Sequence, residues 1–562
     1  MKVLIIGGVA GGASTAARIR RLDEHAEIIM FEKGPHVSFS NCCLPYRLSG
    51  KIKEYDDLIL MNPEVFKKQY NINARVNNEV VKINKKEKTV EVYDSVKKQT
   101  YTESYDKLVV SPGANAIVPP IKGIENAHTF IVKNVVDVTA LNEFITKNGA
   151  KKVTVVGGGF IGCETAENLK EAGYDVSLVE ALDQIMKPFD YDMVQILHKE
   201  MIDHGIHLIL SDKVCEFKES NVVLESGRVV EGDAVVMAIG VRPDTKLCKE
   251  AGIELTDRGA IVVDAHYQTS DPDIYAVGDA IQVFNALTHK PMSLPLAGPA
   301  QKQARQAADS IYGRRVRNTG YIGSSCIKIF DYHAASTGLT VRDCEANGFQ
   351  YDYVYIIPQD KVGIMPGSVP LHYKLIFEVP TGRILGCQCI SKGDAAKRVD
   401  IVATLIKFGG TIDDLRDLEL CYAPPFGTAK DAGNHAALVA ENIMDKTFRQ
   451  VHVSEVRGLW EKGAYIIDVR EPNEYALSHI KGAHNIPLSQ LRDRLDEIPT
   501  DQPVYLHCRS SQRSYNACRC LIGHGFKNVW NISGSYLGIC FYEYFNDVTL
   551  KREPIVTDYN FN

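Results

Sequence analysis

Two cysteine segments stand out in the sequence, one near each end of the chain. Residues 38–46 (SFSNCCLPY) contain Cys42, and residues 507–514 (HCRSSQRS) place Cys508 after an apolar, strand-like stretch. A thiolate attacks disulfides and persulfides, and a helix N-terminus or neighbouring cations favour its formation. The two segments therefore predict chemistry in which sulfur or electrons pass between thiols.

Two glycine-rich turns predict binding of two dinucleotides. Residues 3–12 (VLIIGGVAGG) and 153–162 (VTVVGGGFIG) each follow an apolar strand pattern and open a helix pattern, and a second strand then ends on an acidic residue. Glycines let the backbone approach a pyrophosphate at the helix N-terminus, and the acid can bond a ribose hydroxyl. The expected contacts are Gly7, Gly8, Gly12 and Glu32 in the first unit and Gly157, Gly159, Gly162 and Glu180 in the second.

Length and composition restrict the class of protein. The 562 residues suffice for several domains, and a net charge of -6 does not favour nucleic-acid binding. The chain enters a strand pattern at residues 2–6 without a leader pattern, and no apolar run is long enough to cross a membrane. The 14 cysteines are scattered without C-x-x-C pairs, which favours a reducing cytoplasm and does not favour a zinc site.

Two further segments resemble signatures of the two-dinucleotide flavoprotein disulfide reductases, namely residues 105–114 (YDKLVVSPGA) and 273–280 (DIYAVGDA). The resemblance implies that the first unit binds FAD and the second binds the nicotinamide cofactor. Because the Glu180 carboxylate would repel a 2′-phosphate, NADH is expected rather than NADPH. Beyond the first glycine turn, the resemblance implies FAD contacts from Lys33, Ser111, Gly113, Gly278 and Asp279.

The segment around Cys42 resembles the single-cysteine branch of these enzymes, which comprises coenzyme A disulfide reductases, coenzyme A persulfide reductases, and NADH oxidases and peroxidases. In that pattern Cys42 is the redox nucleophile. Cys43 stands where the family usually has glycine, and is either a packed small side chain or a resolving thiol. Ala10 replaces the histidine that oxidases and peroxidases carry in the first turn, so the peroxidase alternative is disfavoured.

The same resemblance implies coenzyme A binding. The helix after the first turn offers the cations Arg18, Arg20 and Arg21, which could otherwise be a solvated helix face. The positions that match family contacts to coenzyme A are Ser14, Arg18, Arg21, Ser38, Asn41 and Lys430.

Residues 323–446 resemble the family's α+β dimerisation domain, which implies a homodimer. Within it, residues 421–426 (CYAPPF) match the C-terminal motif, so Tyr422 is expected to donate a proton near the partner's Cys42. Ile364 and Met365 stand where relatives often have tyrosines, and a second tyrosine donor is therefore not expected.

A new pattern begins after residues 445–452, which are predicted to be a linker. Residues 465–475 (YIIDVREPNEY) and 479–487 (HIKGAHNIP) resemble rhodanese domains. The loop after Cys508 would direct backbone N–H groups at the thiolate, and Arg509 and Arg513 add positive charge. A phosphatase is the alternative, but Arg513 follows Cys508 by five positions, the shorter spacing that resembles rhodaneses.

Together these patterns predict an α/β fold with glutathione-reductase-like FAD and NAD domains, a dimerisation domain and an α/β rhodanese domain. The predicted boundaries are 1–150 with 271–322 for FAD, 151–270 for NADH, 323–446 for dimerisation and 453–562 for the rhodanese. The expected reaction is NADH-dependent reduction of coenzyme A persulfide or polysulfide to thiol and hydrogen sulfide, with Cys508 receiving sulfane sulfur. The alternatives are a coenzyme A disulfide reductase, an NADH oxidase, and a non-enzymatic redox sensor.

Overall fold

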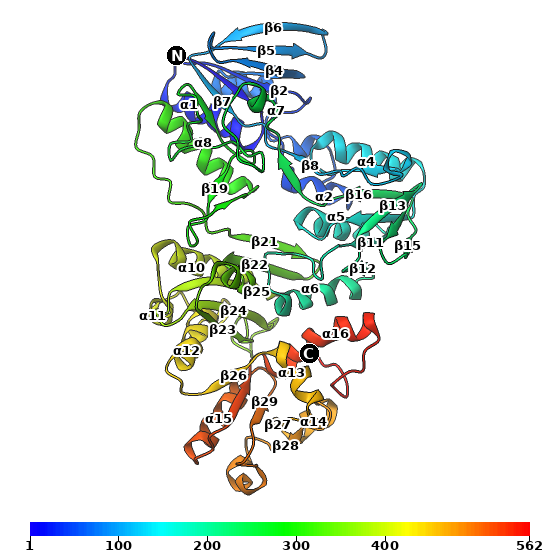
Figure 1. Ribbon diagram of the computed structural model, residues 1–562, viewed down its shortest axis with the longest axis vertical. Coiled ribbons are helices and arrows are strands. Elements are labelled where there is room, and N and C mark those ends of the chain that lie inside the picture. Colours follow the sequence, from blue (N-terminus) through cyan, green and yellow to red (C-terminus); the bar gives the residue numbers. More distant parts are fainter. Residues whose placement is uncertain (562) are drawn as a thin grey trace. The chain divides into compact units, whose positions relative to one another are not determined.

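The computed structural model describes residues 1–561 and divides into two compact parts. The first consists of Met1–Asp183 and Ile209–Tyr321, and the second of Gln184–Leu208 and the chain from Ile322 onward (Figure 1). None of the helices within residues 1–561 is long and apolar enough to span a membrane.

A parallel sheet carries the first glycine turn. Its strand order is β18-β7-β1-β2-β3, and helices α1 and α8 pack against each other beside it (Figure 1). The central strand, KVLII, is almost wholly buried, as expected for a parallel strand covered on both faces. The bounds are β1 Lys2–Ile6, β2 Glu27–Glu32, β3 Asn73–Val76, β7 Lys107–Val110, β18 Ile274–Ala276, α1 Ala10–Leu22 and α8 Ala297–Ile311.

A second sheet repeats this plan around the second glycine turn, with the order β12-β11-β10-β16-β9. Strand β10 pairs in parallel with β11 and β16, and α5 follows directly after the turn. The bounds are β9 Thr129–Phe130, β10 Lys152–Val156, β11 Asp175–Val179, β12 His207–Ile209, β16 Ala234–Met237, α4 Val135–Lys147 and α5 Phe160–Glu171.

Smaller elements border these two sheets. They are η1 Asn41–Cys43, α2 Leu44–Leu48, η2 Asp56–Leu58, α3 Pro63–Tyr70, β4 Asn78–Asn84, β5 Thr89–Asp94, β6 Gln99–Ser104, β8 Ala114–Ala116, η3 Ile124–Asn126, β13 Val214–Lys218, β14 Asn221–Leu224, β15 Val229–Val230, β17 Val241–Pro243, α7 Lys246–Glu250, β19 Val283–Phe284 and β20 Pro291–Met292.

The second part contains an antiparallel sheet with the order β21-β22-β25-β24-β23. Lys374, buried on β24, bonds the Asp192 carboxylate at 2.8 Å and so fixes helix α6 to this sheet. The bounds are α6 Tyr191–Asp203, β21 Ser325–Ile329, β22 Tyr332–Gly338, α9 Val341–Asn347, β23 Tyr351–Ile356, β24 Leu371–Glu378, β25 Ile384–Ser391, α10 Ala395–Phe408, α11 Ile412–Asp417 and α12 Ala432–Met444.

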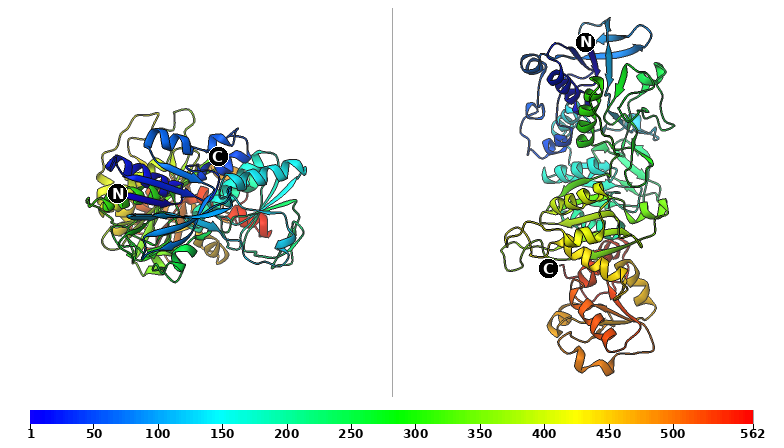
Figure 2. Two further views of the ribbon diagram at one scale, coloured as in Figure 1. Left: turned by 90° about the horizontal axis from the view of Figure 1, so that it is seen from above. Right: turned by 90° about the vertical axis from the view of Figure 1, so that its left-hand side faces the viewer.

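The C-terminal segment forms a further parallel sheet, with the order β26-β30-β29-β27-β28 and helices packed around it. Figure 2 shows its orange and red elements as one compact group. The bounds are β26 Arg449–Val451, α13 Val453–Glu461, β27 Tyr465–Asp468, α14 Pro472–Leu477, β28 His484–Asn485, η4 Leu491–Asp493, η5 Leu495–Glu497, β29 Val504–His507, α15 Gln512–Gly523, β30 Val529–Ile532 and α16 Ser535–Leu550.

The predicted fold class is confirmed, because two glycine-turn sheets, an α+β layer and a C-terminal parallel sheet all form. The predicted linker is wrong in its second half, because residues 449–451 form β26, which pairs with β30. This pairing is stabilised by burial of the Val451 side chain. Strand β9, at residues 129–130, joins the second sheet although it lies inside the predicted first FAD segment. The four domain boundaries stay a prediction.

Candidate functional site

The first glycine turn has the backbone that dinucleotide binding requires. Gly7 has φ +95°, and a Cβ there would lie 2.0 Å from the Ser111 carbonyl oxygen. A Cβ on Gly12 would lie 1.8 Å from the Gly7 carbonyl oxygen. Side chains are therefore excluded, and the helix N-terminus stays open to a ligand. The Glu32 carboxylate accepts the N–H groups of Gly8 at 2.9 Å and Gly34 at 2.8 Å, so the predicted residues of this turn lie together.

Other predicted FAD residues gather near this turn. The Ser111 hydroxyl would lie 2.3 Å from a Cβ added to Gly11 and 3.4 Å from a Cβ added to Gly278, so these three residues lie together. Asp279 follows Gly278, and its carboxylate lies 3.9 Å from the Lys133 ammonium. Gly113, with φ +71°, lies in the loop after β7. Lys33 instead forms an exposed ion pair with Asp244 at 2.9 Å, so its contact with FAD stays a prediction.

The second glycine turn fits a dinucleotide even more closely. Gly157, with φ +111°, and Gly162 leave no room for a Cβ beside the Ala238 and Gly157 carbonyl oxygens. A Cβ on Gly159, by contrast, would meet nothing within 4 Å, which leaves space for a ligand at the N-terminus of α5. The Glu180 carboxylate accepts the Gly158 N–H at 2.6 Å, so an anion occupies the ribose end of this turn.

Cys42 lies on the short helix η1, close to the first glycine turn. Ser38, with φ +49°, donates its N–H to the Gly8 carbonyl oxygen at 2.8 Å, and this bond ties the cysteine segment to the turn. Cys42 is exposed, Cys43 is half-buried, and both are free thiols. Asn41 is the first residue of η1 and is exposed. The two predicted coenzyme A contacts of this segment, Ser38 and Asn41, therefore lie just before an accessible thiol in the chain.

The electrostatic surroundings of Cys42 include residues that sequence reasoning missed. Although Cys42 is exposed as a residue, surrounding protein atoms partly desolvate its thiol and so raise the thiol pKa. Glu164, Cys43 and Asp279 raise this pKa further, whereas Lys133 lowers it. Burial and Glu167 raise the pKa of the Glu164 carboxyl to about 7, while a hydrogen bond with Tyr46 acts in the opposite direction. The signal for Glu164 was its place two residues after Gly162, near the N-terminus of α5.

Replacing Glu164 with glutamine is expected to make Cys42 more reactive near neutral pH. The ionised carboxylate disfavours a nearby thiolate, so its removal lowers the pKa of Cys42 and increases the thiolate fraction. Alkylation of Cys42 by iodoacetamide at pH 7, followed by peptide mass spectrometry, should accelerate about threefold or more. Glu171→Gln is the control, because Glu171 lies on the same helix as Glu164 and its carboxylate pairs with Lys51. An equal acceleration in this control would contradict the assignment.

The arginines of α1 do not have equal roles. Arg20 is buried and donates to five backbone carbonyl oxygens, so its interpretation as a cation for coenzyme A phosphates is wrong. Arg18 donates to the Asp309 carboxylate at 2.9 Å, whereas Arg21 is exposed and Ser14 is half-buried. Coenzyme A contacts by Ser14, Arg18 and Arg21 stay predictions.

Two hydrogen-bonded loops of the second part expose large apolar side chains. The Val362 N–H donates to the Gly427 carbonyl oxygen at 3.2 Å, and these loops hold Ile364, 92% exposed, and Phe426, 72% exposed. Tyr422 is 49% exposed nearby in sequence. Lys430 is also exposed. Large side chains left in water on adjoining loops are typical of an interaction surface.

Cys508 directly follows strand β29, in the loop that leads to the N-terminus of α15. Its side chain is 1% exposed, and its sulfur lies 3.6 Å from the Ser514 hydroxyl and 4.0 Å from the Ser535 hydroxyl. Arg513 donates to both carboxylate oxygens of Glu474, at 2.6 and 2.8 Å, and directly precedes Ser514 in the chain. The loop thus offers hydroxyls, a guanidinium and a helix N-terminus to a sulfur anion.

Helix α16 supports this loop from a distant part of the sequence. The Tyr536 and Leu537 N–H groups donate to the carbonyl oxygens of Cys508 and Arg509, both at 3.1 Å. Ser535 has φ +49°, and its hydroxyl accepts the Cys508 N–H at 3.2 Å. The sequence motif around Cys508 did not predict Ser535, because only tertiary folding brings these residues together.

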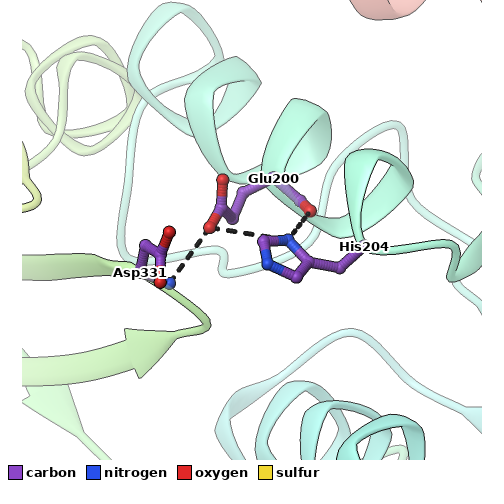
Figure 3. A group of neighbouring side chains, drawn as sticks. All are labelled: Glu200, His204 and Asp331. Carbon is purple, nitrogen blue, oxygen red and sulfur yellow. Dashed lines mark hydrogen bonds and ion pairs between the residues drawn. The ribbon is translucent and has the colours of Figure 1, made fainter.

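A third group of ionisable side chains, Glu200, His204 and Asp331, lies on the second part (Figure 3). The Glu200 carboxylate accepts the Asp331 N–H at 3.0 Å, and the His204 ring stacks on Phe330. Asp331 also pairs with Lys392 at 3.2 Å. These contacts join α6 to the β21–β22 turn and give each group a structural role.

Comparison with known proteins agrees with this geometry. The sequence matches the pyridine nucleotide-disulphide oxidoreductase family over residues 1–304, its dimerisation domain over 324–432, and the rhodanese-like domain over 452–540. It is 33% identical over 443 residues to the coenzyme A disulfide reductase of Staphylococcus haemolyticus, covering 79% of this chain and 100% of that one.

Two solved structures resemble nearly the whole chain. Reduced CoADR-RHD from Bacillus anthracis has a TM-score of 0.93 and 43% identity, covering 97% of this chain and 98% of its own. The NAD-dependent persulfide reductase from A. fulgidus has a TM-score of 0.91 and 33% identity, covering 96% of this chain and 100% of its own. The chain therefore belongs to the pyridine nucleotide-disulphide oxidoreductase family and carries that family's dimerisation domain and a rhodanese-like domain.

Proposed function

We propose that this protein is an FAD-dependent enzyme that uses NADH to reduce coenzyme A persulfide to coenzyme A and hydrogen sulfide. The observation that carries the proposal is the presence of two different thiol sites in one chain. Cys42 is exposed on a segment bonded to a dinucleotide turn, and Cys508 is buried in a cradle of hydroxyls and an arginine. The first suits electron transfer to sulfur and the second suits sulfur transfer.

Cys42 would carry out the reductive half of the reaction. Its thiolate attacks the inner sulfur of the persulfide, forming a mixed disulfide with coenzyme A and releasing hydrosulfide. FAD, when bound at the first glycine turn, supplies the two electrons that NADH provides. Reduction of the mixed disulfide would return Cys42 and coenzyme A as thiolates, and Tyr422 would protonate the thiolate that leaves.

Cys508 would supply the persulfide. It takes the outer sulfur of a donor persulfide or polysulfide, and the donor leaves as the thiol or shortened polysulfide. Coenzyme A thiolate then attacks that sulfur, which forms coenzyme A persulfide and restores Cys508. The Ser514 and Ser535 hydroxyls and Arg513 lie where they can stabilise the sulfur anion in both steps.

Several observations favour NADH and a homodimer. The Glu180 carboxylate, held by the Gly158 N–H, would repel a 2′-phosphate, which supports NADH over NADPH. The exposed side chains of Ile364, Phe426 and Tyr422 lie on loops of the dimerisation domain, where a second copy would bury them. Tyr422 would then approach the partner's Cys42.

A coenzyme A disulfide reductase is the second candidate function, because coenzyme A disulfide would also form a mixed disulfide with an exposed Cys42. An NADH oxidase is disfavoured by Ala10 in the first turn. The experiment measures NADH absorbance at 340 nm with coenzyme A persulfide, coenzyme A disulfide, glutathione persulfide and polysulfide, together with sulfide release. We expect one sulfide per NADH with coenzyme A persulfide; comparable NADH loss with oxygen alone and no sulfide would refute the proposal.

A further inference from the structure

Two arginines near Cys508 are each paired with a carboxylate, whereas Arg509 donates to the Asn560 carbonyl oxygen at 3.1 Å. Buried Arg470 donates to Asp468 through Nε at 3.0 Å and Nη2 at 2.6 Å. Arg513 donates to Glu474 through Nη1 and Nη2 at 2.6 and 2.8 Å. His507 adds no positive charge, because burial lowers its pKa.

The two pairs differ in their access to a substrate. Asp468 and Arg470 are fully buried, so no donor reaches them. Arg513 and Glu474 keep 34% and 30% of their side-chain surface, and Arg513 directly precedes Ser514, whose hydroxyl lies 3.6 Å from the Cys508 sulfur. The pair of Arg513 and Glu474 is therefore reached by solvent beside the loop of Cys508.

Glu474 is held in this position by its own helix. It is the third residue of α14, and its carboxylate accepts the Glu471 N–H at 3.2 Å in a capping box. A bidentate arginine–carboxylate pair also restrains the planar guanidinium. The Arg513 guanidinium near Cys508 is thus already paired with a carboxylate.

We propose that Glu474 selects the sulfur donor at Cys508 by neutralising Arg513. This inference rests on the proposed sulfur-transfer function of Cys508. Thiosulfate is a dianion. When it donates sulfur, a bond forms between Cys508 Sγ and the outer sulfur of thiosulfate, the S–S bond of thiosulfate breaks, and sulfite leaves with the electron pair. A thiol persulfide carries at most one charge at its sulfane group, and its thiolate leaves instead. Glu474 opposes the dianion more strongly and so favours thiol persulfides.

The test uses the full-length holoenzyme and cyanide as acceptor, so that Cys508 persulfide and cyanide yield thiocyanate and the Cys508 thiolate. Thiocyanate is measured with thiosulfate and with glutathione persulfide, at low and high salt. Glu474→Gln keeps the size of the side chain and removes its charge. Glu471→Gln is the matched control, because Glu471 caps the same helix and bonds Ser489 at 3.1 Å. Cys508→Ser gives the background.

Glu474→Gln is expected to raise kcat/KM for thiosulfate about tenfold, mainly through KM, and to change kcat/KM for glutathione persulfide less than about twofold. The gain should shrink as salt screens the exposed pair. Equal changes with both donors, no change with either, or the same gain in Glu471→Gln would overturn the proposal.

The proposed function is tested separately by NADH oxidation with coenzyme A persulfide, which does not require a donor at Cys508. If the wild-type enzyme fails this assay while Glu474→Gln still changes the donor preference, the reductase proposal is refuted and the role of Glu474 stands. The opposite pair of results would refute the role of Glu474 alone.

Discussion

Replacing Cys42 with serine is expected to lower NADH oxidation with coenzyme A persulfide by about 1,000-fold or more. Serine cannot form the mixed disulfide, so electrons have no covalent route to the substrate sulfur. Thiocyanate formation at Cys508 should stay within about twofold of wild type, because that assay uses neither dinucleotide turn. Both rates are measured on one preparation, with the flavin content checked by absorbance.

Cys43→Ser is the matched control for this variant, since it changes the adjacent thiol, which is half-buried rather than exposed. Near-normal NADH oxidation in Cys43→Ser would identify Cys43 as a packed side chain. A loss as deep as that of Cys42→Ser would identify it as a resolving thiol. If Cys42→Ser itself kept more than about a tenth of the activity, the proposed nucleophile would be wrong.

The parts of the sites that sequence patterns predicted are those determined by neighbours along the chain. Gly7, Gly12, Gly157 and Gly162 are needed because a Cβ at each would strike a carbonyl oxygen of the same turn or of the segment after a neighbouring strand. Glu32 ends β2 and Glu180 directly follows β11, and each carboxylate bonds the turn beside it. Cys508 likewise lies between a strand and a helix that the pattern around it predicts.

The parts that patterns missed depend on contacts between distant residues. Arg20 has the same sequence neighbourhood as Arg18 and Arg21, yet it is buried by carbonyl groups that include those of Tyr70 and Asn71. Ser535 reaches Cys508 through the packing of α16, and its hydroxyl could not be assigned from the local motif. The strand at residues 449–451 is a short edge strand whose sequence has no clear alternation, and its partner β30 comes almost 80 residues later.

Replacing Cys508 with serine is expected to separate sulfur delivery from reduction. With polysulfide or glutathione persulfide plus coenzyme A, NADH oxidation should fall about 100-fold, because the hydroxyl cannot accept sulfane sulfur. With preformed coenzyme A persulfide, the rate should stay within about twofold of wild type, since Cys42 reacts directly. The measurement is NADH absorbance with each donor, together with sulfide release.

Cys520→Ser is the matched control for this second variant, because Cys520 is a half-buried thiol on α15, outside the loop of Cys508. It should leave both rates unchanged. If Cys508→Ser reduced polysulfide as fast as wild type, the rhodanese-like domain would not feed Cys42, and the protein would act as a coenzyme A disulfide or persulfide reductase with an independent sulfurtransferase. A selective loss with polysulfide would instead show that sulfane sulfur enters at Cys508 before it meets electrons at Cys42, because preformed coenzyme A persulfide bypasses only the first step.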